Sequence, residues 1–232
     1  MNPVRWNSST FRHINRTASA MSNEHLRTPG DGVHDVVMTD GDLSTDAELM
    51  SRTAAGDEVA FRELVERYQQ AVFGTCYRML GSSYQDAEDL SQAVFVKVFR
   101  AAGSYRPEAL FKTWLMTIVR NTVFTQLKKS RRRREREADW HHADDDAEPD
   151  YPDHETSDAS QIAEKKELMR ILSNAIHELP PPQRMALILR QYEEMDYEEI
   201  ARVQGTTVSA VKSLLFRARE QLRQTVVAYR GV

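Results

Sequence analysis

The stretch DYEEIARVQGTTVSAVKSLLFRARE, residues 196–220, decides the fold because two helix starts and one tight turn can be located within it. Asp196 can cap a helix, and Glu199, three positions later, completes a capping box. Gly205 supplies a sharp turn, and either of the two threonines after it can cap the next helix. The stretch therefore predicts two short helices joined by a tight turn.

The small and apolar residues of this stretch have the spacing of a helix-turn-helix. Ala201 allows close approach of the helices, Gly205 makes the turn, and Val211 anchors the second helix in the core. The residues expected to face inward are Ile200, Ala201, Val208, Val211, Leu214 and Leu215.

The opposite face of the second helix combines polar, cationic and aromatic side chains. These residues are Thr207, Ser209, Lys212, Ser213, Phe216, Arg217 and Arg219. Such a face offers donors for base edges and phosphates and an apolar contact for a thymine methyl, so we predict binding in the major groove of DNA. The alternative is a solvated face with ordinary ion pairs such as Arg217 to Glu220. The hydroxyls at the helix start favour a phosphate and weigh against it.

The bulk composition excludes several classes of protein. The 232 residues carry a net charge of −4, with 41% hydrophobic and 28% charged residues, which argues against a protein that coats nucleic acid uniformly. No apolar run reaches the roughly 20 residues of a membrane span, and no secretory signal is evident, so we expect a cytoplasmic protein without membrane insertion. The single cysteine, Cys76, excludes an internal disulfide, and its apolar neighbours predict a core position.

Composition and periodicity divide the chain into four parts. Residues 1–43 lack apolar periodicity and are expected to be a disordered extension. Residues 44–136 predict a helical domain, residues 137–161 an acidic flexible linker, and residues 162–232 a second small helical domain. No segment shows the period-two alternation of a strand, so the predicted fold is all-α.

Three helices are expected in the first domain. Ser44 or Thr45 can cap a helix whose apolar face continues from Phe61 to Leu80, over about five turns, and Gly81 and Ser82 end it. The second helix is expected over residues 84–101, and the third over residues 109–132, with Trp114 on its apolar stripe.

Four helices are expected in the second domain. The first carries Ile171, Leu172, Ala175, Ile176 and Leu179 and is stopped by the prolines at 180–182. The second covers residues 184–192, and the two shorter helices of the helix-turn-helix follow.

Three segments together resemble the bacterial extracytoplasmic-function sigma factors of the sigma-70 family. They are DAEDLSQAVFVKVFRA, FKTWLMTIVRNTVFTQLKK, and ELPPPQRMALILRQYEEMDYEEIA followed by the helix-turn-helix. The resemblance covers about residues 44–136 and 162–228, in the order of the family and with its linker between. It implies a factor that directs core RNA polymerase to promoters, with the last helix reading the −35 element.

The resemblance also implies roles for residues of the first domain. Its second helix would dock on core RNA polymerase through Asp86, Glu88, Asp89, Gln92 and Phe95, although the acids also complement a helix N-terminus. The loop at 104–110 and the third helix would read and open the −10 element. The residues expected there are Tyr105, Arg106, Lys112, Asn121 and Lys128, with Arg120 and Lys129 adding positive charge.

Other features leave alternatives open. The arginines at 131–134 can contact DNA phosphates or form a solvated helix end, and the acidic linker can fold back on them. His141 and His142 lack the rigid surroundings of a metal site, and no catalytic motif is found, so we expect no metal, no cofactor and no enzymatic activity.

The main alternative function is a helix-turn-helix regulator that dimerises and binds a palindrome without polymerase. The resemblance further implies an anti-sigma partner.

Overall fold

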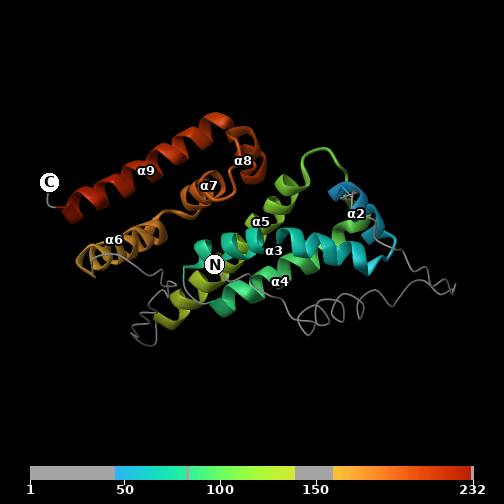
Figure 1. Cartoon of the computed structure of the whole chain (residues 1–232), viewed down its shortest axis with the longest axis horizontal. Helices are drawn as coiled ribbons and strands as arrows, with labels where there is room; N and C mark the ends of the chain where they lie inside the picture. Colours follow the sequence, from blue (N-terminus) through green and yellow to red (C-terminus); the bar gives the residue numbers. More distant parts are fainter. Residues whose placement is uncertain (1–44, 82–83, 139–158, 231–232) are drawn as a thin grey trace.

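The structure is a computed structural model that describes residues 45–81, 84–138 and 159–230. Within these ranges all regular elements are helices, and they form two groups, α2 to α5 and α6 to α9 (Figure 1). The prediction of an all-α fold with two helical domains is confirmed. The expected extension at residues 1–43 and residues 139–158 of the expected linker lie outside the described residues.

The first group contains four α-helices and one short 3-10 helix. They are α2 (Asp46–Ala54), α3 (Glu58–Leu80), α4 (Tyr84–Ala101), η1 (Ala102–Ser104) and α5 (Phe111–Ala138). The capping box at Thr45 opens α2, which ends before Gly56 at φ +93°, and Asp57 then caps α3 by accepting from the amides of Val59 and Ala60. The helix expected to follow directly from the first cap is therefore two helices. The Gly56 and Asp57 pair is the stop and start signal that separates them.

The core of the first group lies between α3, α4 and α5. Its fully buried side chains include Phe61, Leu64, Val72, Cys76, Val94, Val98, Leu115 and Val119. Burial raises the pKa of the Cys76 thiol to about 12, which confirms its predicted core position. Helix α4 has the predicted bounds, whereas α5 begins two residues later than expected and continues six residues further, as a basic helix whose side chains at 131–136 are exposed.

The second group consists of α6 (Ala159–Glu178), α7 (Pro181–Gln191), α8 (Tyr197–Gln204) and α9 (Val208–Arg230). Pro181 belongs to the first turn of α7, where a helix needs no amide hydrogen bond, so the prolines separate α6 from α7 and also open α7. The expectation that the last helix is short is wrong. Helix α9 has 23 residues because it packs against α6 and α7 as well as α8.

The two groups are in contact with each other. Helix α8 packs on α5, and α7 packs on α3, in the middle of the molecule as drawn in Figure 1. Among the described helices, none is long and apolar enough to cross a membrane.

Candidate nucleic-acid interface

The turn between α8 and α9 has the predicted geometry. The Asp196 carboxylate accepts from the Glu199 amide at 2.7 Å, and the Glu199 carboxylate accepts from the Asp196 amide at 2.9 Å. Gly205 ends α8 in the left-handed region at φ +63°. The Thr207 hydroxyl accepts from the Ala210 amide at 3.2 Å, so Thr207 caps α9. Local side-chain to backbone bonds therefore fix the angle between the two helices.

One face of this helix pair is buried and the other is exposed, as predicted. Ile200, Ala201, Val211 and Leu215 are buried, and Val208 and Leu214 are half-buried against the core. Thr207, Ser209, Lys212, Ser213, Phe216, Arg217 and Arg219 are all exposed. Burial of the apolar stripe therefore leaves the predicted DNA-binding side chains in solvent.

A shallow, open hollow lies on the exposed face of α9. It is lined by Ser209, Lys212, Ser213, Phe216 and Arg217. Phe216 is 69% exposed, so a large apolar side chain lies in solvent beside the two cationic ones.

The suggested ion pair between Arg217 and Glu220 is not formed. Glu220 pairs instead with Arg223 at 2.6 Å, and the bonds from Arg223 and Gln224 lower the pKa of this exposed carboxyl to about 2. Within the part of the chain that the structure describes, Arg217 makes no ion pair. Its charge is therefore available to a ligand.

The loop before α5 rests on a cluster of aromatic rings. The Tyr105 ring lies 4.9 Å from Trp114 and 5.8 Å from Phe111, and Phe111 lies 5.0 Å from Tyr68, as distances between ring centroids. Partial burial, and next the nearby Asp46 carboxylate, raise the pKa of Tyr105. Trp114 is half-buried in this cluster, in accord with its predicted place on the apolar stripe.

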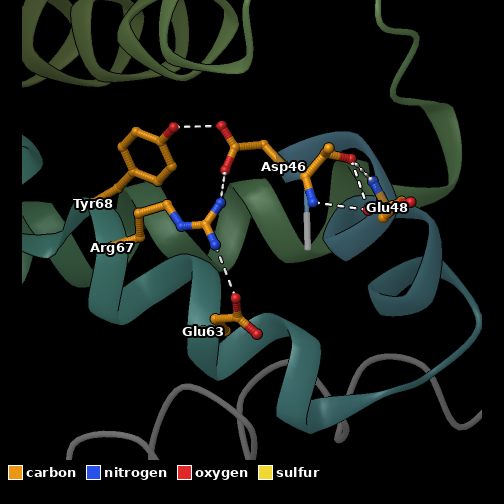
Figure 2. A network of polar contacts seen from close by, with 6 residues as sticks. Asp46, Glu48, Glu63, Arg67 and Tyr68 are labelled. Carbon is orange, nitrogen blue, oxygen red and sulfur yellow. Dashed lines mark hydrogen bonds and ion pairs between the residues drawn. The ribbon is translucent and has the colours of Figure 1, made fainter. Parts of the chain in front are cut away.

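A polar network holds α2 against α3 beside this cluster (Figure 2). The Tyr68 hydroxyl donates to Asp46 at 2.5 Å, and the Arg67 guanidinium contacts Asp46 at 2.6 Å and Glu63 at 2.8 Å. Burial, and then the hydrogen bond to Asp46, raise the pKa of Tyr68. The first residue of α2 is thus tied to the ring on which Phe111 packs.

The predicted −10 residues differ in their surroundings. Arg106, Asn121 and Lys128 are exposed. Asn121 accepts from Arg120 at 2.9 Å, and Arg106 donates to the carbonyl of Tyr105 at 2.9 Å. Lys112 is half-buried, and its ammonium lies 3.0 Å from the Glu193 carboxylate of the other domain.

Five residues of α4 are predicted to bind polymerase, and the side chains of four of them are exposed or half-buried. Asp86 and Asp89 are exposed, and Glu88 and Gln92 are half-buried. Phe95, however, is 1% exposed and fully packed in the core. The expectation that it forms the apolar centre of an exposed interface is wrong, because its position on α4 falls on the stripe that faces α3 and α5.

Two buried charged residues were missed by sequence reasoning. Glu193 is 8% exposed, and Arg184 is 8% exposed, and both lie where the second domain touches the first. Arg184 donates to the carbonyl of Met79 at 2.7 Å and also to that of His177. Glu193 stands in a charge-rich turn, where no periodic signal separates it from its solvated neighbours, and Arg184 is a single charge between three prolines and an apolar run, where the local pattern does not name a partner for it.

No cluster of three or more potential metal ligands occurs among the described residues. His141 and His142 lie outside these residues.

Comparison with known proteins identifies two family regions in this chain. Residues 64–133 match Sigma-70 region 2, and residues 169–222 match Sigma-70, region 4. An RNA polymerase sigma-H factor of Pseudomonas aeruginosa is 36% identical over 180 residues, which are 76% of this chain and 91% of that protein. An ECF RNA polymerase sigma-E factor of Escherichia coli is 36% identical over 183 residues, which are 78% of this chain and 94% of that protein.

Solved structures share the fold. One is the sigma factor RpoE of Bartonella quintana in complex with the anti-sigma factor NepR, with a TM-score of 0.58 and 24% identity over 72% of this chain and 96% of that chain. Another is CnrH in complex with the cytosolic domain of CnrY, with a TM-score of 0.55 and 23% identity over 79% of this chain and 97% of that chain.

Proposed function

This chain belongs to the sigma-70 family as an RNA polymerase sigma factor of the extracytoplasmic-function type, and we propose how its surfaces divide the work of promoter recognition. The first domain, residues 44–136, binds core polymerase and the −10 element, and the second, residues 162–232, binds the −35 element. The observation that carries this division is the exposed face of α9, which presents cationic, hydroxyl and aromatic groups over a buried apolar stripe.

The face of α9 reads the −35 element in the major groove. Thr207 and Ser209 lie at the helix start, where amide groups and the helix dipole favour a phosphate. Lys212 and Arg217 donate to base edges or phosphates, and Phe216 contacts a thymine methyl. Ser213 and Arg219 complete the surface. The hydroxyl of Ser213 donates to the carbonyl of Ser209 at 3.1 Å, so its oxygen remains able to accept a further bond.

The loop before α5 and the exposed side of α5 bind the −10 element. Tyr105 stands on Phe111 and Trp114, which is a suitable floor for an extruded base. Arg106, Asn121 and Lys128 are exposed and supply amide and cationic groups for the opened strand. The exposed basic end of α5 adds phosphate contacts.

The start of α4 binds core polymerase through Asp86, Glu88, Asp89 and Gln92. These side chains give the polar rim of a protein interface. We further infer that the factor itself catalyses no reaction, that it acts in the cytoplasm, and that an anti-sigma factor covers some of these surfaces, because one solved structure with this fold is a sigma factor in complex with an anti-sigma factor.

The experiment is transcription in vitro from a genomic fragment library, with core RNA polymerase in the presence and absence of this protein. New start sites that share a pair of upstream elements are the expected result. Protection of symmetric half-sites by the protein alone, without any new start, would instead identify an independent regulator.

Alanine variants of α9 test the −35 assignment. Lys212→Ala and Arg217→Ala should each lower initiation from the mapped promoters about tenfold, since one lost DNA contact costs about 1–3 kcal/mol. Arg223→Ala is the matched control, because it removes the same charge from the same helix at a residue paired with Glu220. Binding to core polymerase, measured by co-purification, should be equal for all variants. Loss of core binding together with transcription would refute the assignment.

A further inference from the structure

A contact between the two domains centres on Glu193, in the connection between α7 and α8. Its carboxylate lies 3.0 Å from the Lys112 ammonium and 3.4 Å from the Thr75 hydroxyl. Lys112 also donates to the backbone carbonyl of Glu193 at 2.8 Å. The Glu193 side chain is only 6% exposed, and a carboxylate so buried requires a cation or donors as partners. Its partners both belong to the first domain.

Further contacts surround this ion pair. The Thr113 hydroxyl lies 3.3 Å from the Glu199 carboxylate, and Arg120 donates to the carbonyl of Gln204 at 3.4 Å. The Arg78 guanidinium lies 3.8 Å from the centre of the Tyr192 ring. The first domain thus contributes cationic groups from α3 and α5 to this contact. The second domain contributes a segment rich in acidic residues. We name residues 192–199 the acidic segment; its acids are Glu193, Glu194, Asp196, Glu198 and Glu199.

The acidic segment meets the first domain where DNA is expected to bind. Lys112 is one of the residues assigned to the −10 element, and Arg120 stands beside Asn121 on the same helix. A carboxylate offers such cations the same negative oxygen ligands as a phosphate. We propose that the acidic segment is an internal competitor of promoter DNA, which docks on the −10 surface and keeps the free factor closed. The proposal rests on the proposed function and adds a mode of regulation to it.

The closed arrangement is incompatible with simultaneous binding of both promoter elements. Arg120 contacts the backbone of Gln204, and Ser209 follows five residues later, so the two DNA surfaces approach within about 18 Å plus the length of a side chain. The centres of the −35 and −10 elements are about 25 base pairs apart, or about 85 Å at 3.4 Å per pair. The domains must therefore separate before both surfaces reach their elements.

The contact is also suited to being broken. Two buried polar atoms of side chains that reach across between the domains, Arg120 Nε and Arg184 Nε, have no hydrogen-bond partner within the described part of the chain. Unsatisfied buried polar atoms cost free energy, which solvation on opening returns. A competing ligand such as core polymerase then needs only a modest difference in affinity to shift the equilibrium.

Variants of the ion pair test the proposal in the full-length chain. Glu193→Gln removes the charge and keeps the shape, and Thr75→Val removes the second partner of Glu193 without touching any assigned DNA contact. Glu194→Gln is the matched control, since it removes the same charge from the neighbouring residue, which is exposed. Circular dichroism melting verifies that each variant is folded. If Glu193→Gln does not fold, the proposal is tested with Thr75→Val alone.

Two quantities are measured for each variant without polymerase. The first is the affinity for a fluorescein-labelled single-stranded DNA of random sequence, by anisotropy. The second is energy transfer between dyes on cysteines introduced at Gln70 of α3 and Asn174 of α6, both exposed, while the buried Cys76 stays unlabelled. Glu193→Gln and Thr75→Val should bind DNA about tenfold more tightly, as expected when a mostly closed state is opened, and should show lower energy transfer. Glu194→Gln should match the wild type in both.

Two results would overturn the proposal. One is equal DNA affinity and energy transfer for Glu193→Gln and Glu194→Gln, and the other is domain opening without any gain in DNA binding. The in vitro transcription assay distinguishes failure of the internal-competitor proposal from failure of the proposed function. Glu193→Gln should initiate at the wild-type start sites at least as strongly as wild type, whereas absence of starts with the wild-type protein would refute the proposed function whatever the domain contact does.

Discussion

At the scale of single residues, Asp46 is connected through a chain of contacts to the loop at 104–110. Its two carboxylate oxygens are shared between the Arg67 guanidinium and the Tyr68 hydroxyl. Tyr68 in turn supports Phe111, which supports Tyr105. One carboxylate thus links the start of α2 to the aromatic floor on which the loop rests, as Figure 2 shows for its polar half.

Removal of the Tyr68 hydroxyl tests this link. Tyr68→Phe should lower the free energy of unfolding by about 1 kcal/mol, because a partly buried hydrogen bond to a charged group is lost while the ring remains. Urea denaturation measures the change. Tyr84→Phe is the control, since this tyrosine is 55% exposed, and its effect should stay within about 0.5 kcal/mol. Equal effects of the two substitutions would show that the bond to Asp46 contributes nothing.

At the scale of elements, helix ends are set by local chemistry. Capping boxes open α2 and α8, Asp57 opens α3, and glycines in the left-handed region close α3 and α8. These signals act over three or four residues, which is why the helix ends at Thr45, Gly81, Asp196 and Gly205 follow from the sequence. The two closing glycines differ in their surroundings, and that difference is testable.

Gly81 and Gly205 form a matched pair for substitution by alanine. Gly205→Ala should cost about 1–2 kcal/mol of unfolding free energy, since φ is +63° and a Cβ there would meet nothing within 4 Å. Gly81→Ala should cost more, because φ is +73° and the added Cβ would also clash with the His177 ring. Gly81→Ala should also lower the energy transfer between domains, whereas Gly205→Ala should not. A cost for Gly81→Ala no greater than for Gly205→Ala would contradict the contact between α3 and α6.

At the scale of the whole molecule, the two domains share a junction at His177. This is the one histidine in the described part of the chain, and its ring lies against Gly81 of the first domain. Burial, and next the Arg184 guanidinium, lower the pKa of His177 to about 4 from an ordinary value of 6.5. The folded state therefore holds this imidazole neutral where the unfolded state protonates it.

The sign of the resulting pH dependence follows from proton uptake. Between about pH 6.5 and 4 the unfolded chain binds the proton and the folded chain does not, so stability falls as the pH falls through this window. His177→Gln should reduce the loss of stability between about pH 7 and about pH 5, measured by urea denaturation at each pH. Carboxylates titrate equally in both proteins, so the difference isolates His177. An unchanged pH dependence would mean that the ring is solvated in the folded protein.

Much of this organisation could be predicted from the sequence. The helix-turn-helix follows from Asp196, Gly205 and the apolar spacing, and the exposed face of α9 follows from the same helical period. Phe95 was misassigned because resemblance gave it a role in binding, whereas its place on the apolar stripe of α4 gives burial. The length of α9 was underestimated because its last turns are stabilised by packing on α6.

The sequence by itself determined the all-helical fold, the helix-turn-helix and the set of side chains exposed on α9, because caps, turns and amphipathic periods act between residues that are close in the chain. Only the tertiary structure decided that Lys112 pairs with Glu193 and that Arg184 reaches Met79, contacts that span 81 and 105 residues. No local pattern encodes such pairs, because they depend on how two separately folded groups of helices dock. The same docking turns a predicted DNA contact into an ion pair within the protein.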